Sequence, residues 1–185
     1  MSAIITLPGI GDSDEHHWQT FWERADPTIR RFAPSDWDNP DLDDWIAALD
    51  RVVAAASEPP ILIAHSLACL LVAHWAARQS RPLSRPVRGA FLVGVPDPDS
   101  AVFPATEAAS FRDVPETVLP FPALVVASSD DPYGSLAYAR GRAAVWGAGF
   151  VVAGALGHIS SASALGDWPL GAMLFEAFRA GTARR

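Results

Sequence analysis

The stretch PPILIAHSLACLLVA, residues 59–73, decides the fold. An apolar run of strand length, Ile61 to Ala64, is followed by the polar pair His65-Ser66 and then by an Ala/Leu-rich segment with good helix propensity. A strand that enters a helix through a tight turn carrying a serine is typical of a nucleophile elbow, in which backbone strain presents the hydroxyl. Serine is also a common helix N-cap at such a junction, so this stretch alone leaves both roles open for Ser66.

The elbow departs from the usual Gly-x-Ser-x-Gly pattern, because Ala64 and Ala68 stand where glycines are common. Alanine is the smallest residue with a Cβ, so we expect close packing of the strand against the helix to survive. Cys69 is the only cysteine of the chain, which excludes an internal disulfide and fits a reducing compartment. Three residues after Ser66, it is expected to be a packing residue rather than a reactive thiol.

Length and composition predict a single globular domain over residues 1–185. A chain of this length can bury one sizeable core, and half of its residues are hydrophobic while only 19% are charged. The formal net charge is −7, and the 14 basic residues are scattered rather than gathered on a basic face. We therefore expect no nucleic-acid partner.

No targeting or membrane signal is recognisable in the sequence. Residues 1–8 lack a basic region, and their apolar run is too short for a signal peptide. The longest apolar region, residues 61–77, is interrupted by polar side chains and falls short of a membrane span. The sequence therefore predicts a soluble, cytoplasmic protein without membrane contact.

Alternating apolar runs and amphipathic segments predict an α/β protein. Strands are expected at 3–7, at 28–33, in the elbow, and at 89–95, 123–127 and 150–153. Helices are expected at 14–24 with Ser13 or Asp14 as N-cap, at 41–56, from the elbow to about Ser80, at 136–146 and from about Leu170 to Ala180. The long stretch from Pro96 to Pro122, rich in proline and phenylalanine, is a candidate pocket wall.

The expected strands are apolar throughout rather than patterned for a solvent face. This predicts a mostly parallel sheet of about six strands with helices on both faces, a three-layer sandwich. In such sheets ligands bind beyond the carboxyl ends of the strands. The polar loops of this chain follow those ends, which favours a catalytic Ser66 over a simple N-cap.

Acyl transfer by a serine needs a base, an acid that orients the base, and donors for the oxyanion. Ser66 is followed by Asp130-Asp131 after one later strand and by His158 after the next. This order of serine, acid and histidine is typical of α/β-hydrolases. The candidate nucleophile is therefore Ser66, and the candidate base is His158.

Two neighbouring carboxylates compete for the role of the acid. Asp131 precedes Pro132, which removes a backbone donor and fixes the turn, whereas Asp130 can merely cap that turn. Asp97 and Asp99, after the preceding strand, are further candidates because some hydrolases place the acid one strand earlier. We favour Asp131.

The oxyanion hole is expected to pair the backbone N–H of Leu67 with that of Ile10, in the loop after the first strand. Gly9 and Gly11 allow this loop to turn its amides inward. A tight turn without function would use the same glycines, so the glycines alone do not decide.

The remaining histidines give no metal signal. His16 and His17 are adjacent, so they point to different faces of a helix, and no further ligand stands at a suitable spacing. His65, next to the nucleophile in sequence, is expected to be positional rather than a base. We expect neither a metal nor a cofactor.

Together these motifs resemble the minimal single-domain serine hydrolases of the retinoblastoma-binding-protein and YdeN type, an α/β-hydrolase subgroup without a cap domain. The resemblance covers nearly the whole chain. The segments that carry it are LPGIGDS at 7–13, HWQ at 17–19, Trp22, Asp36-Trp37, Pro40, Asp44-Trp45, Leu49-Asp50, AHSLA at 64–68, SSDDPY at 128–133, GHI at 157–159 and LGDWPLG at 165–171.

The resemblance implies a triad of Ser66, Asp131 and His158 and the hydrolysis of a carboxylic ester or similar acyl bond. Relatives commonly have glycine at the position of Ala64, and this departure removes no catalytic group. The resemblance supplies the chemistry more firmly than a natural substrate.

The main hypothesis is a carboxylesterase-like serine hydrolase that acts on a small-molecule acyl substrate through an acyl-enzyme. Transfer of the acyl group to an acceptor other than water is a related alternative. A non-catalytic interaction module is the second class, motivated by the altered elbow and by seven tryptophans in 185 residues. No feature of the sequence indicates a particular protein partner.

Overall fold

The structure is a computed structural model that describes residues 3–79 and 86–182. Its centre is a six-stranded sheet with the order β2-β1-β3-β4-β5-β6, in which every neighbouring pair is parallel. The strands are β1 (Ile4–Leu7), β2 (Arg30–Arg31), β3 (Ile61–His65), β4 (Gly89–Val93), β5 (Ala123–Ala127) and β6 (Gly149–Val152).

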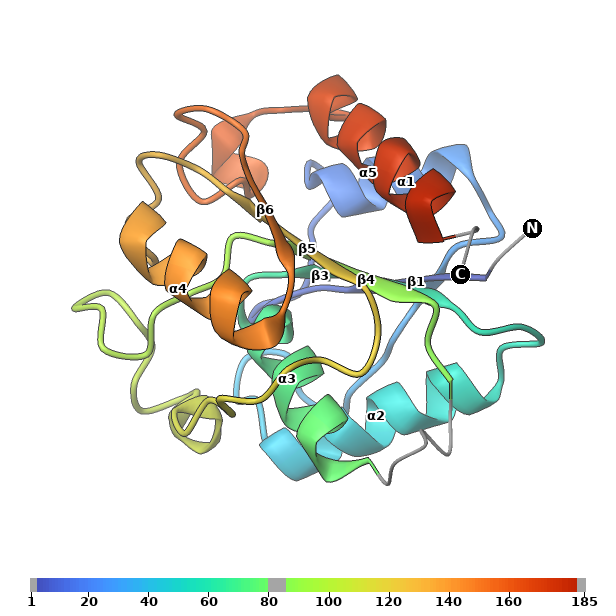
Figure 1. Cartoon of the computed structure of the whole chain (residues 1–185), viewed down its shortest axis with the longest axis horizontal. Helices are drawn as coiled ribbons and strands as arrows, with labels where there is room; N and C mark the ends of the chain where they lie inside the picture. Colours follow the sequence, from blue (N-terminus) through green and yellow to red (C-terminus); the bar gives the residue numbers. More distant parts are fainter. Residues whose placement is uncertain (1–2, 80–85, 183–185) are drawn as a thin grey trace.

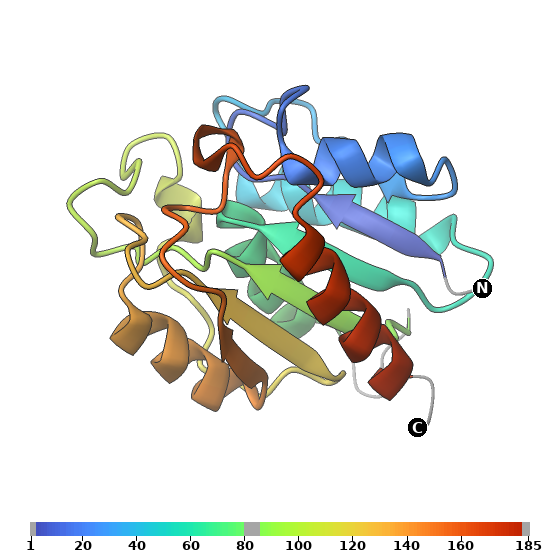
Figure 2. The ribbon, with the colours of Figure 1, turned by 90° about the horizontal axis from the view of Figure 1, so that it is seen from above.

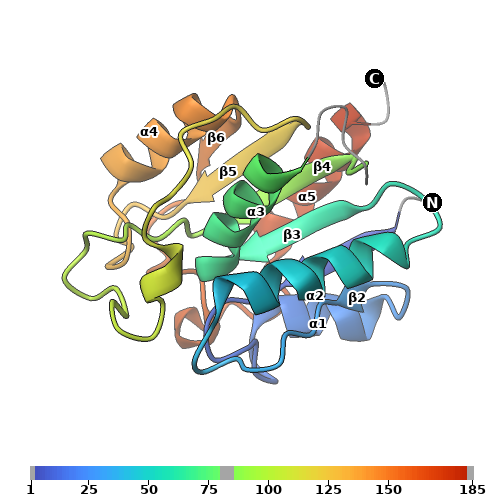
Figure 3. The same cartoon turned by 90° about the horizontal axis from the view of Figure 1, so that it is seen from below.

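Within the described ranges, five α-helices cover the sheet on both faces, which makes the three layers expected from the sequence (Figure 1). They are α1 (Trp18–Ala25), α2 (Leu42–Ala54), α3 (Leu67–Arg78), α4 (Leu136–Trp146) and α5 (Pro169–Thr182). Two short 3₁₀ turns, η1 (Ala109–Phe111) and η2 (Ser161–Ser163), lie in the loops. Figure 2 shows α1 and α5 over one face of the sheet, and Figure 3 shows α2, α3 and α4 over the other.

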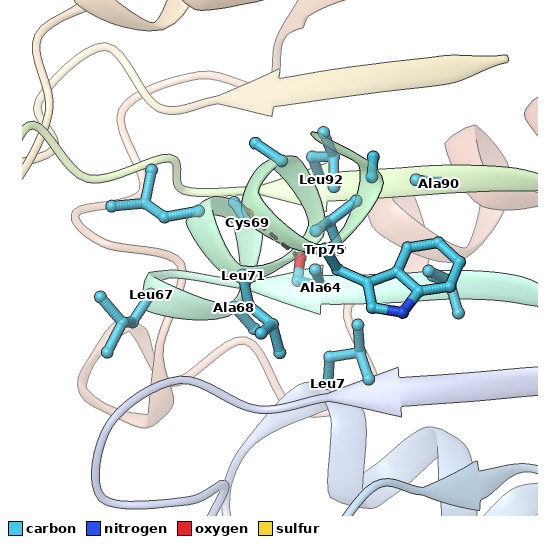
Figure 4. Packing of buried hydrophobic residues seen from close by; sticks show 14 of the residues in the cluster. Leu7, Ala64, Leu67, Ala68, Cys69, Leu71, Trp75, Ala90 and Leu92 are labelled. Atoms are coloured by element: carbon cyan, nitrogen blue, oxygen red, sulfur yellow. Dashed lines mark hydrogen bonds between the residues drawn. The ribbon is translucent and has the colours of Figure 1, made fainter. Parts of the chain in front are cut away.

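The strands are buried on both faces, so successive residues enter two different cores. In β3, Leu62 and Ala64 face α2, α3 and α4, whereas Ile61 and Ile63 face α1 and α5. Figure 4 shows the first core around Cys69, whose thiol lies 3.6 Å from the carbonyl of Ala64. Burial raises the pKa of the Cys69 thiol, which fits the expected packing role.

Most predicted bounds lie within two residues of the observed ones, but the second strand is four residues shorter than expected and the first helix begins four residues later. The strand expected at 28–33 is reduced to β2, because the amides of Thr28 and Ile29 bond to Asp26 in a turn before the sheet. The helix expected from residue 14 begins only at Trp18, and its N-cap is His17 rather than Ser13 or Asp14.

The late start of α1 has a local cause. The carboxylate of Asp14 accepts the amide of His16 at 2.8 Å, and the Asp14 carbonyl accepts the amide of His17 at 3.2 Å. These bonds form a separate turn before the helix. The end of α3, the helix after the elbow, was expected near Ser80. Ser80 lies outside the described ranges, and α3 ends at Arg78.

Candidate active site

Ser66 occupies a strained junction between β3 and α3. Its φ is 54° and its ψ is −126°, a backbone conformation that side chains with a Cβ rarely adopt. The Ser66 amide donates to the carbonyl of Val93 at 2.9 Å, which ties the turn to β4. The hydroxyl makes no capping bond to the helix, so the N-cap role that the sequence left open is not used. Ala64 and Ala68 are fully buried on either side, so the elbow forms without its usual glycines.

His158 connects Ser66 to Asp131. Its Nε2 lies 2.8 Å from the hydroxyl oxygen of Ser66, and its Nδ1 lies 2.9 Å from both carboxylate oxygens of Asp131. Because a carboxylate only accepts, Nδ1 carries the proton and Nε2 presents a lone pair to the serine. The side chains of His158 and Asp131 are 11% and 3% exposed, so water competes little for these bonds. The arrangement can therefore take a proton from Ser66.

The competing carboxylates have other partners. Asp130 accepts the hydroxyl of Ser128 at 2.7 Å and the amide of Gly157 at 2.8 Å. The bond from Gly157 ties the loop after β5 to the loop that carries His158, and both bonds lower the pKa of Asp130. Asp97 accepts the amide of Asp99, and Asp99 pairs with Arg112. Among the four candidates, Asp131 is the carboxylate placed against His158.

The loop after β1 passes directly over the elbow. A Cβ on Gly9 would lie 2.8 Å from the Cβ of Ser66 and 3.2 Å from the carbonyl oxygen of His65, so this approach requires glycine. Ile10 lines the same cavity as Ser66 and Leu67. Leu67 is the first residue of α3, where backbone N–H groups have no partner within the helix. The two residues expected to hold an oxyanion thus both lie beside the serine.

The same loop is held in place by neighbours on both sides. Gly11 and Asp12 have positive φ values, 79° and 64°, which turn the chain sharply. The Gly11 amide donates to the carbonyl of Trp37 at 2.9 Å. Arg31 of β2 donates to the Asp12 carboxylate at 2.8 Å and to the Ser13 carbonyl at 2.9 Å. These bonds fix the position of Ile10 relative to the elbow.

A cavity of about 320 Å³ opens over the serine. Pro96, Val102 and Pro104 form part of its wall, so the long irregular stretch does contribute to a pocket, as expected. The other lining residues are Gly9, Ile10, Asp12, His17, His65, Ser66, Leu67, Tyr133, His158, Ser160 and Ser161. The lining therefore combines apolar side chains with hydroxyl, imidazole and carboxylate groups.

Two further histidines, His17 and His65, line the cavity beside His158, and no sequence pattern predicted that they would lie together there. His17 is 4.7 Å from His65 between ring centroids, and His65 is 5.0 Å from His158. Burial lowers the pKa of His17 to about 4 and holds that of His65 well below its usual value, so both rings are neutral near pH 7. The Nδ1 of His17 accepts the amide of Gln19, and its buried Nε2 has no partner among the described residues.

Tyr133 is another pocket residue whose role the sequence did not indicate. Its ring packs on His158 with 4.4 Å between centroids, and its amide donates to Asp131 at 2.9 Å.

In residues 3–79 and 86–182, no group of three or more His, Cys, Asp or Glu side chains is placed to bind a metal ion. The same ranges contain no helix that is long and apolar enough to span a bilayer.

The seven tryptophans pack inside the molecule. Trp37 is partly buried, and the other six are at most 9% exposed. They join the helices to the sheet and the loops. Trp22 is an example, because its indole donates to the carbonyl of Asp167 at 2.7 Å. The tryptophans, which together with the altered elbow motivated the interaction-module alternative, are therefore buried or partly buried.

Comparison with known proteins agrees with this geometry. Residues 4–177 match the family described as serine hydrolase. No curated protein sequence matches the chain. Among solved structures, a putative YdeN-like hydrolase from Pectobacterium atrosepticum is 28% identical with a TM-score of 0.85, and the match covers 98% of this chain and 92% of that one.

Two more distant structures share the fold. The ydeN gene product of B. subtilis is 18% identical with a TM-score of 0.78, covering 97% of this chain and 100% of that one. The esterase domain of a Rhodothermus marinus protein is 19% identical with a TM-score of 0.64, covering 94% and 87%. The architecture is therefore that of an α/β-hydrolase without a cap domain.

Proposed function

Because the chain belongs to the serine hydrolase family, in its YdeN-like branch, we propose that it cleaves carboxylic esters or similar acyl bonds through Ser66, His158 and Asp131. The observation that carries this proposal is the unbroken series of contacts from Asp131 to His158 to Ser66, each within 2.9 Å. An enzyme of the esterase type is what the family and its structural relatives support.

In the first half of the reaction, the Ser66 oxygen attacks the carbonyl carbon of the substrate while Nε2 of His158 takes the hydroxyl proton. Asp131 keeps the imidazole in the required tautomer and stabilises its positive charge. The backbone amides of Ile10 and Leu67 hold the negative oxygen of the tetrahedral intermediate. The carbon–oxygen bond to the leaving group then breaks, and His158 returns the proton to that oxygen.

In the second half, water attacks the acyl-Ser66 ester. His158 takes a proton from this water, and the intermediate collapses to a carboxylic acid as the proton returns to the Ser66 oxygen. Acyl transfer differs only in the acceptor, because an alcohol would then occupy the place of the water. No observation in the structure favours such an acceptor, so hydrolysis is the function proposed.

The cavity limits the substrate class. Its volume of about 320 Å³ is at the lower end of the range for small-molecule sites, which is roughly 300–1,000 Å³. The apolar wall of Pro96, Val102 and Pro104 suits an alkyl or small aromatic group. We therefore propose a short or medium acyl ester as the substrate.

The test is hydrolysis of p-nitrophenyl acetate, butyrate and octanoate by the wild type, by Ser66→Ala and by Ser129→Ala. Ser129 is exposed and lies outside the cavity, so it is the matched control. We expect Ser66→Ala to lower kcat by about 10³-fold or more and Ser129→Ala to leave it unchanged. Equal turnover by wild type and Ser66→Ala would overturn the assignment of the nucleophile.

A further inference from the structure

The backbone directly after His158 is strained. Ile159 has a φ of 52°, although a β-branched residue almost never occupies the left-handed region. Such a conformation persists only where the surrounding structure holds it, because relaxation to negative φ is favourable. Contacts from other parts of the protein must therefore stabilise the turn that presents the imidazole to Ser66.

Two ring N–H groups supply bonds at this point. Nε2 of His65 lies 3.0 Å from the carbonyl oxygen of His158, and Nε1 of Trp18 lies 2.8 Å from the carbonyl oxygen of Ile159. Since a carbonyl only accepts, both rings donate. Trp18 is 1% exposed and His65 is 5% exposed, so water competes little for these two ring N–H groups. Two successive carbonyls of the strained turn are thus held by buried rings from α1 and β3.

We propose that His65 and Trp18 form a carbonyl clamp that positions His158 for proton transfer with Ser66. The inference rests on the proposed function, since it assigns positioning residues to the same reaction. The bonds of His158 to Asp131 and Ser66 orient its ring, whereas the clamp holds the main chain to which the ring is attached. Neither clamp residue exchanges a proton with the substrate.

The neutral ring of His65 is compatible with the positive charge that His158 acquires during the reaction. The imidazole of His158 carries a full positive charge when it holds the proton of Ser66. The ring of His65 lies only 5.0 Å away, and a charged His65 would repel that imidazolium. Burial of His65, with the nearby His17 and His158, keeps its pKa well below the usual value, so it donates its bond as a neutral ring.

Loss of either bond frees the turn to relax from its positive φ, which moves the imidazole away from Ser66. A displacement of about 1 Å in a catalytic group can lower the rate by up to about 10²-fold. The expected signature is a lower kcat with little change in KM, because the bonds that are lost join the clamp to the backbone of the base. Trp18 does not line the cavity, so Trp18→Phe tests this signature without changing the pocket wall. A purely structural role would lower the stability without this pattern.

The chain offers matched controls for both clamp residues. Trp146, in α4, donates its indole N–H to the carbonyl of Pro115 at 3.2 Å. His74, in α3, is bonded through Nε2 to the carbonyl of Phe111 at 3.2 Å. Trp146→Phe and His74→Leu therefore each remove a bond from a buried ring to a main-chain carbonyl, away from the turn of His158.

The experiment measures kcat and KM for p-nitrophenyl butyrate with Trp18→Phe, His65→Leu, His65→Gln and the two controls, each corrected for its folded fraction at the assay temperature. We expect Trp18→Phe and His65→Leu to lower kcat by about tenfold or more, with KM within about twofold of the wild type. His65→Gln should recover part of the loss, because its amide can donate to the same carbonyl. Trp146→Phe and His74→Leu should keep the wild-type kcat.

Two results would overturn the clamp while leaving the proposed function intact. One is an active wild type whose Trp18→Phe and His65→Leu variants keep the same kcat. The other is an equal loss in the clamp variants and in the two controls. A wild type that neither turns over esters nor reacts with a fluorophosphonate at Ser66 would overturn the proposed function, and the clamp with it.

Discussion

The hydroxyl oxygen of Ser66 lies 2.8 Å from Nε2 of His158, although 92 residues separate the two in the chain. The parallel sheet explains this proximity. Ser66 follows β3 and His158 follows β6, and all strands end at the same edge because all pairs are parallel. The loops after β5 and β6 then reach back over the central strand, where the elbow presents its serine.

Substitution of each aspartate in turn distinguishes the role of Asp131 from that of Asp130. We expect Asp131→Asn to lower kcat by about 10³- to 10⁴-fold, because an amide no longer enforces the tautomer that leaves Nε2 free to accept the proton. Asp130→Asn should lower kcat by less than about tenfold, since Asp130 bonds to Ser128 and Gly157 and not to the imidazole. Steady-state ester hydrolysis measures both. An equal loss in the two variants would contradict the assignment of Asp131.

The close approach of Gly9 to the elbow predicts the effect of a single methyl group. In Gly9→Ala the new Cβ would lie 2.8 Å from the Cβ of Ser66, so the loop after β1 must move. Because this loop carries Ile10, kcat should fall by about 10- to 100-fold. Gly141→Ala is the control, because nothing lies within 4 Å of its Cβ position in α4.

Gly141→Ala should leave kcat unchanged and raise the free energy of unfolding by up to about 1 kcal/mol, since alanine favours the helix. Thermal unfolding and ester hydrolysis of both variants measure these effects. Wild-type activity in Gly9→Ala would show that the loop does not need its present position.

Buried neutral histidines predict a loss of stability in mild acid. Burial lowers the pKa of His17 to about 4, whereas an unfolded histidine has a pKa of about 6.5. Between these values the unfolded chain binds more protons, so the free energy of unfolding falls as the pH drops from about 7 to 4. The His17 contribution is roughly 3 kcal/mol. The lowered pKa values of His65 and His74 act in the same direction.

His17→Asn isolates this contribution, because asparagine can still accept the amide of Gln19 at the helix start but does not titrate. Denaturant unfolding at pH 7, 6, 5 and 4.5 should give a shallower loss of stability for the variant than for the wild type. The same pH dependence in both proteins would mean that His17 is protonated equally in the folded and unfolded chains.

Much of the fold could be predicted because local signals agree with the tertiary structure. The α4 bounds, 136–146, follow from an apolar pattern that Ser135 caps and Gly147 ends, and β5 is a continuous apolar run between polar loops. The prediction was wrong at the start of α1, where the side chain of Asp14 bonds to a nearby amide in a turn. A local turn also explains why β2 is shorter than predicted, because the amides of Thr28 and Ile29 bond to Asp26.

The candidate site could be predicted as far as chain order carries information. The order of Ser66, Asp131 and His158 follows from the strands, and the structure brings these three side chains together. The bond from Trp18 to Ile159 joins residues 141 positions apart, and no local pattern encodes it. The positive φ of Ile159 contradicts the preference of its own side chain, so only tertiary contacts could reveal it.

Whether Ser66 is the nucleophile is tested most directly by the reaction of the protein with a fluorophosphonate, read by intact mass and peptide mapping. An activated serine displaces fluoride and forms a phosphorus–oxygen bond, so each labelled chain gains one adduct. We predict one adduct, on Ser66, in the wild type and in Ser160→Ala and Ser161→Ala, and none in Ser66→Ala. An adduct on Ser160 or Ser161 in the wild type, or equal labelling of Ser66→Ala, would contradict the claim that Ser66 is the nucleophile.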